Sequence, residues 1–209
     1  MLTDAPDLAG LREAAVVFNG FAGVDVSWER LLVDIAPGWN LGKAAHRLLL
    51  LRWLNSWGCR IRYPRPGEPA PFDAGIKAWW RTWRSALPSG SLVDLSDRDI
   101  DQVADAYAAL SAMPAAAGRQ LGPTAAAKAL FALRPDAIMP WDATIATRLH
   151  GARDGAAFHR HLTLGRAWAR SVVAEAGAAD AVADLVGRPG MSLAKILDEY
   201  LYVTITMTA

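Results

Sequence analysis

Two short segments hold the residues whose types and spacing could do chemistry. The first begins at Gly122, followed by Pro123 and Thr124, and the second ends in Trp141 and Asp142. Glycine permits a sharp turn and proline suits a first helical turn, so the first segment predicts a glycine-turned helix start. We expect Asp142 to begin the next helix. A carboxylate fixed there could stabilise positive charge that develops on a sugar and could activate water.

Asp142 also has a purely structural interpretation. Aspartate is a favoured N-cap residue, and Pro140 two positions earlier makes that role natural. Capping and catalysis are compatible roles. Lys128, one helical turn beyond Thr124, is expected to be a surface lysine or an ion-pair partner that could reach Asp142.

Composition narrows the classes of protein. The chain has 209 residues, of which 53% are apolar, and we expect most of its nine tryptophans in the core. Its one cysteine, Cys59, excludes an intramolecular disulfide framework and a cysteine-rich zinc or iron-sulfur site. We expect no metal and no cofactor. The N-terminus lacks a signal-peptide pattern and no run of 18 apolar residues occurs, so we expect a cytoplasmic protein without a membrane span.

Charge is nearly balanced, at a formal +1, but unevenly distributed. Five arginines and three histidines fall between positions 148 and 170, opposed by Asp154 alone, whereas five aspartates crowd positions 94–105. The basic segment predicts either a basic surface for nucleic acid or a solvated helix face. Arg148, the first member of that segment, is our candidate binding residue from it.

The elements that must position these residues are helices, because apolar residues recur mostly at three- and four-residue spacing. Four prolines between positions 63 and 71 predict a loop, which could connect two lobes. The β-branched and aromatic tail predicts an extended end after the last helix. We expect an all-α fold of about ten helices, over residues 6–18, 28–35, 41–57, 72–87, 97–113, 124–133, 142–149, 155–176, 179–186 and 192–203.

Residues 118–149 resemble the active-site half of the helix-hairpin-helix DNA glycosylase superfamily, in the manner of its 8-oxoguanine glycosylase-like members. The resemblance rests on Gly122, the helix after it, and the sequence Pro140-x-Asp142. It implies a single two-lobed bundle of about ten helices over residues 1–209. It also implies hairpin amides that hold a nucleic-acid backbone, and it places Asp142 at the position of the catalytic aspartate.

The hairpin is degenerate relative to that superfamily. Only the second of the two hairpin glycines is present, as Gly122, and Thr124 replaces the lysine that lyase members carry. Lys128 lies about 6 Å further along the helix, which disfavours a Schiff-base lyase reaction. The resemblance therefore implies a monofunctional N-glycosylase, in which Asp142 stabilises an oxocarbenium-like state and activates water.

We expect this activity to excise a base from nucleic acid, with the base extruded into a pocket. The candidate substrate or DNA contacts are Gly122, Thr124, Lys128, Trp141 and Arg148, with Trp141 or another tryptophan stacking on the base. Two alternatives stay open. The near-neutral charge and the degenerate hairpin favour a glycosidase acting on a free modified nucleoside or nucleotide. The other alternative is a non-enzymatic helical binding module in which Asp142 only caps its helix.

Overall fold

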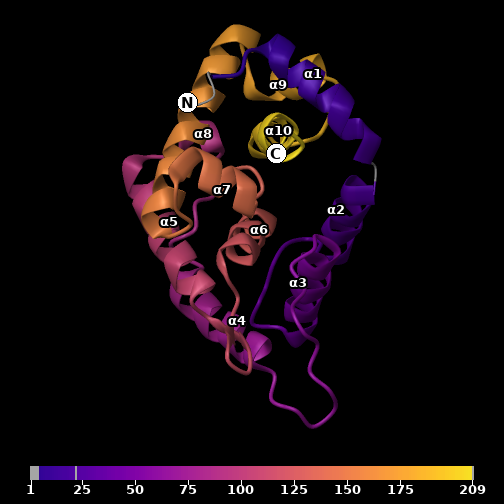
Figure 1. Cartoon of the computed structure of the whole chain (residues 1–209), viewed down its shortest axis with the longest axis vertical. Helices are drawn as coiled ribbons and strands as arrows, with labels where there is room; N and C mark the ends of the chain where they lie inside the picture. Colours follow the sequence, from indigo (N-terminus) through magenta and orange to yellow (C-terminus); the bar gives the residue numbers. More distant parts are fainter. Residues whose placement is uncertain (1–4, 22, 209) are drawn as a thin grey trace.

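The computed structural model describes residues 5–21 and 23–208, and nearly all of its regular structure is helical (Figure 1). A two-stranded hairpin, β1 (Pro114–Ala116) and β2 (Arg119–Gln120), lies between two helices, and short helical turns occur at η1 (Asn19–Phe21), η2 (Leu92–Asp94) and η3 (Tyr202–Thr206). The all-α prediction is confirmed. The ten α-helices of the described residues are α1 (Leu8–Phe18), α2 (Gly23–Asp34), α3 (Ala44–Ser56), α4 (Pro71–Trp83), α5 (Asp97–Ser111), α6 (Pro123–Leu133), α7 (Ala143–His150), α8 (Gly155–Ala176), α9 (Ala179–Leu185) and α10 (Leu193–Leu201).

The starts of α6 and α7 follow from their sequences. Gly122 precedes α6 with a φ of 83°, a conformation that favours glycine, and Pro123 takes the first helical position. Asp142 caps α7, its side chain accepting from the backbone amide of Ile145. Both predicted helix starts are confirmed.

The prediction of an extended chain end is wrong. Tyr202–Thr206 continues α10 as a π-helical turn, which packs against α1 and α7. Ile205 is buried there, and the hydroxyl of Thr204 donates to the carbonyl of Tyr200. Burial against neighbouring helices therefore outweighs the β-propensity of this tail.

Helix α10 is the element around which the site forms. It packs on α1, α8 and α9, and Figure 1 shows it end-on in the upper part of the view, below α1 and α9. The face that it buries carries Leu193, Ile196, Leu197 and Leu201. Residues of α10 therefore meet residues of α1 that are distant in sequence.

The proline-rich segment between α3 and α4 is a loop, as predicted. Glu68 stabilises the loop by accepting hydrogen bonds from the side chain of Arg62 and from the backbone amide of Arg65. The buried Arg47 joins the starts of α3 and α4, because it donates to both carboxylate oxygens of Asp73. The role of this loop as a connection between two lobes stays a prediction.

No described helix is long and apolar enough to cross a membrane.

Candidate active site

A cavity of about 240 Å³ forms where the ends of α1 and α3 meet α6, α10 and the turn before α7. We call it the Asp142 cavity. Its lining combines aromatic and charged side chains from separate stretches of the chain. The aromatic members are Phe18, Trp57, Trp141 and Tyr202, and the charged members are Lys128, Asp142, Lys195 and Asp198.

Asp142 enters this cavity with both carboxylate oxygens oriented. Oδ1 accepts from the amide of Ile145 and Oδ2 accepts from the hydroxyl of Thr206, each at 2.8 Å. A carboxylate oxygen can accept more than one hydrogen bond, so both retain capacity for a ligand. The N-terminus of α7 favours the negative charge. Asp142 is thus an immobilised anion at the edge of an open space.

Lys128 lines the same cavity, but its ammonium donates to a backbone carbonyl rather than to Asp142. Its ammonium donates to the carbonyl of Trp57 at 2.7 Å and lies 5.5 Å from the centre of the Trp57 ring. Lys128 therefore joins α6 to the end of α3 while presenting positive charge to the cavity.

Four further charged residues at or next to the cavity lining were missed by sequence reasoning. Lys195, only 2% exposed, places its ammonium 3.3 Å from carboxylate oxygens of both Asp198 and Glu199. Glu199 in turn pairs with Arg188 at 2.6 Å. Burial raises the pKa of Asp198 to about 6, although Lys195 opposes that change. The spacing of Lys195, Asp198 and Glu199 could have marked one charged face of the last helix.

Trp141 borders the Asp142 cavity but is only 1% exposed. Its ring packs edge-on against Tyr107 and Phe158, with centroids 5.7 and 5.0 Å away. Trp57 is less buried than Trp141, and the ammonium groups of Lys128 and Lys195 each lie 5.5 Å from the centre of its ring. Trp57 is therefore more accessible to a ligand than Trp141 is.

Two histidines support the turn that carries Asp142. Nε2 of His161 lies 3.1 Å from the Pro140 carbonyl, and its Nδ1 lies 3.1 Å from Nε2 of His150. Since a carbonyl only accepts, His161 carries its proton on Nε2 and His150 donates to its Nδ1. Burial lowers the pKa of His150 to about 4 and that of His161 to about 3, so both are neutral near pH 7.

The remaining predicted contacts lie outside the lining of this cavity. The amide of Gly122 donates to the carbonyl of Ser111, which ties the start of α6 to the end of α5 across the base of the β1–β2 hairpin. Thr124 is half-buried in the first turn of α6, and Arg148 is exposed on α7. The structure thus brings together Lys128, Trp141 and Asp142 among the predicted residues, and leaves Gly122, Thr124 and Arg148 apart from them.

The basic segment faces the acidic one within the molecule. Arg166 pairs with Asp97 at 2.6 Å, and His159 lies 3.1 Å from Asp101. Arg170 donates to the carbonyl of Val93. These contacts join α8 to α5 and η2, and Asp97 compensates the charge of Arg166 within the molecule.

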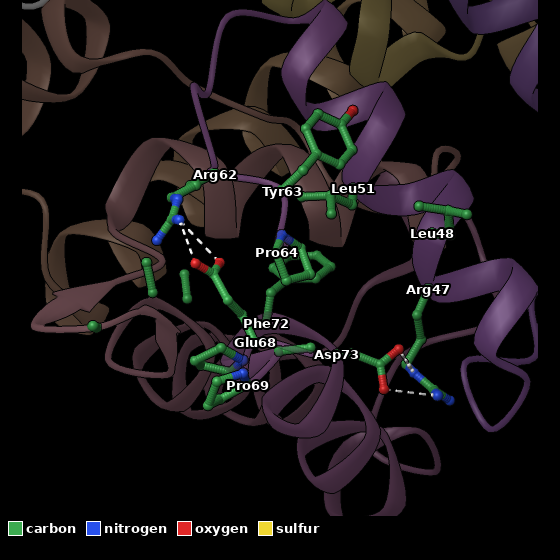
Figure 2. A pocket seen from close by; sticks show the side chains of 15 residues that line it. Arg47, Leu48, Leu51, Arg62, Tyr63, Pro64, Glu68, Pro69, Phe72 and Asp73 are labelled. Carbon is green, nitrogen blue, oxygen red and sulfur yellow. Dashed lines mark hydrogen bonds and ion pairs between the residues drawn. The ribbon is translucent and has the colours of Figure 1, made fainter. Parts of the chain in front are cut away.

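A second, larger cavity of about 500 Å³ lies beside the proline-rich loop (Figure 2). Its charged groups are already paired with one another, Arg47 with Asp73 and Arg62 with Glu68, as the dashed lines in Figure 2 show. The rest of its lining is mostly proline, alanine and other apolar side chains. Each carboxylate of this cavity is paired with an arginine, whereas Asp142 accepts only from the uncharged Ile145 amide and Thr206 hydroxyl.

Comparison of the chain with models of known protein families, with curated proteins and with solved structures gives no match. Within the described part of the chain, no group of three or more histidine, cysteine, aspartate or glutamate side chains could hold a metal ion. The interpretation of the site therefore depends on its own geometry.

Proposed function

We propose that this chain is a cytoplasmic, monofunctional N-glycosylase that excises a base from nucleic acid, with Asp142 as the catalytic carboxylate. The observation that carries the proposal is the position of Asp142 on the wall of an open, aromatic-lined cavity. Asp154 caps α8 with the same hydrogen bond, to the amide three residues on, yet it lies outside that cavity. Capping alone therefore does not account for the surroundings of Asp142.

The reaction that suits this geometry is hydrolysis of an N-glycosidic bond. As the bond between the sugar carbon and the base nitrogen breaks, its electron pair leaves with the base and positive charge develops on the sugar. The fixed carboxylate of Asp142 stabilises that charge and accepts a proton from the attacking water. The hydrogen bonds from Ile145 and Thr206 hold it in place throughout.

The two lysines of the cavity support hydrolysis rather than lyase chemistry. A Schiff base requires an amine that is free to reach the sugar, and the side-chain nitrogen of Lys195 lies 3.3 Å from carboxylate oxygens of both Asp198 and Glu199. The ammonium of Lys128 is held by the carbonyl of Trp57. Both residues are better suited to attract a polar ligand than to attack a sugar.

A free modified nucleoside is the second candidate substrate. The cavity, at about 240 Å³, is smaller than the roughly 300–1,000 Å³ of most small-molecule sites. Two arginines that could bind a nucleic-acid backbone, Arg166 and Arg170, instead contact α5 and η2 within the molecule. Both observations fit a small substrate.

A panel of substrates tests the proposal. Lesion-containing and mismatched duplexes and single strands, together with free nucleosides, are incubated with the parent protein and with Asp142→Asn. We expect base release from at least one substrate and its loss in the variant. Binding to DNA that weakens steeply with salt would favour nucleic acid over a nucleoside, because phosphate contacts release counterions. Absence of release from every substrate would favour a non-enzymatic module.

A further inference from the structure

The Asp142 cavity contains a second carboxylate in an opposite environment. Asp142 lies at a helix N-terminus and accepts from two uncharged donors, the Ile145 amide and the Thr206 hydroxyl. Asp198 lies inside α10, is 14% exposed, and accepts from the Lys195 ammonium at 3.3 Å. Pairs of acids whose surroundings differ in this way divide the roles of acid and base in many active sites.

The charged groups that face Asp198 come from its own helix and from α6. Lys195 and Lys128 favour its ionised form, whereas burial and Glu199 favour its protonated form. From α1 the cavity receives the apolar ring of Phe18, and from the start of α7 it receives Asp142. With the pKa of Asp198 raised to about 6, its carboxyl group exchanges a proton close to neutral pH.

Cleavage of an N-glycosidic bond needs such a proton. The electron pair of the broken bond stays on the base, and protonation of a base ring nitrogen or exocyclic oxygen makes the base a better leaving group. We propose that Asp198 is a second catalytic residue, the general acid that donates this proton while Asp142 stabilises the sugar. This inference rests on the proposed function and extends it.

The step balances with water as the other reactant. Asp198 gives its proton to the base, and the glycosidic electron pair goes to the base nitrogen. Water adds to the sugar carbon and loses a proton to Asp142. Proton exchange with solvent then restores Asp198 and Asp142 to their starting forms through the open side of the cavity.

Two substrates with different leaving groups separate an acid from a structural residue. One is the best base substrate of the panel, and the other is the 4-nitrophenyl glycoside of the same sugar, whose nitrophenolate leaves without protonation. Asp198→Asn is expected to lower base release at least about 100-fold at pH 6, the usual contribution of a general acid, and to change nitrophenolate release far less. Asp142→Asn should lower both. Asp105→Asn, exposed on α5, is the matched control and should lower neither.

The pH profile supplies an independent readout. In the parent protein the rate of base release should fall above about pH 6, as Asp198 loses its proton, and this fall should disappear in Asp198→Asn. Lys195→Gln removes a cation that favours the ionised form, so the fall should move to higher pH. If circular dichroism shows that Asp198→Asn does not fold, the pH profile of Lys195→Gln tests the inference in its place.

Three outcomes would overturn the inference. Equal losses on the two substrates in Asp198→Asn would indicate a structural role, and an unchanged pH profile in Asp198→Asn or in Lys195→Gln would exclude a general acid at this position. Either result would leave the proposed function standing, provided that Asp142→Asn abolishes release. Absence of release by the parent protein from every substrate would contradict both proposals together.

Discussion

Asp142 is positioned by two hydrogen bonds that differ in origin. The one from Ile145 is local and is set by the sequence of α7 itself, whereas the one from Thr206 crosses 64 positions. The second exists only because η3 packs against α7. At the scale of single residues, the proposed chemistry therefore depends on a side chain in the tail as well as on the aspartate.

Thr206→Val tests this dependence. Loss of a hydrogen bond to a charged group costs about 1.5–3 kcal/mol, so base release should fall roughly tenfold or more, mainly through kcat. Steady-state kinetics on the best panel substrate would measure it. Thr204→Val is the matched control, because the hydroxyl of Thr204 donates to a backbone carbonyl on the same turn. An equal loss in both variants would refute a specific role for Thr206.

At the scale of elements, α6 begins after a residue whose backbone conformation favours glycine. Gly122 adopts a φ of 83°, and a Cβ there would meet no heavy atom within 4 Å. The cost of a side chain is therefore one of backbone conformation alone. The resulting direction of α6 carries Lys128 to the Asp142 cavity.

Gly122→Ala is expected to lower the free energy of unfolding by about 1–3 kcal/mol, the cost of a backbone conformation that is essentially confined to glycine. Urea denaturation followed by circular dichroism would measure it. Gly20→Ala provides the comparison, because Gly20 also has open space around its Cβ position but no positive φ. A loss no larger than that of Gly20→Ala would contradict the expectation.

Sequence predicted the helices well and the site only in part, for physical reasons. Helix periods and caps are local, so α5, α6 and α7 could be placed to within one or two residues. Asp142 as an N-cap was predictable on the same basis. Asp198, Lys195 and Thr206 approach Asp142 only through the packing of α10 and η3, and for Thr206 the sequence suggested an extended tail. The pairing of His150 with His161 likewise arises from the packing of α7 on α8.

At the scale of the whole molecule, the histidine pair links stability to pH. Burial lowers the pKa of His161 from 6.5 to about 3, so the unfolded chain binds a proton that the folded chain does not between those values. Stability should therefore fall as pH drops below about 6.5, by up to about 1.4 kcal/mol per pH unit for His161. The contribution of Asp198 to the pH dependence of stability has the opposite sign, because its raised pKa adds stability as pH falls through 6.

Chemical denaturation between pH 7 and pH 4 would measure this dependence. His161→Gln should be less stable than the parent protein at pH 7 but should show a shallower decline toward pH 4. His46→Gln, at a histidine outside the pair, should retain the parent slope. A parent slope that persists in His161→Gln would contradict the account.

The central claim is that Asp142 does more than cap a helix, and one comparison tests it most directly. Asp142→Asn and Asp154→Asn both preserve a good N-cap residue, so both should retain nearly all of the stability. Single-turnover base release is then measured for each on the best panel substrate. The account predicts near-complete loss in Asp142→Asn and a parent-like rate in Asp154→Asn. Equal rates in the two variants would show that Asp142 is a cap alone.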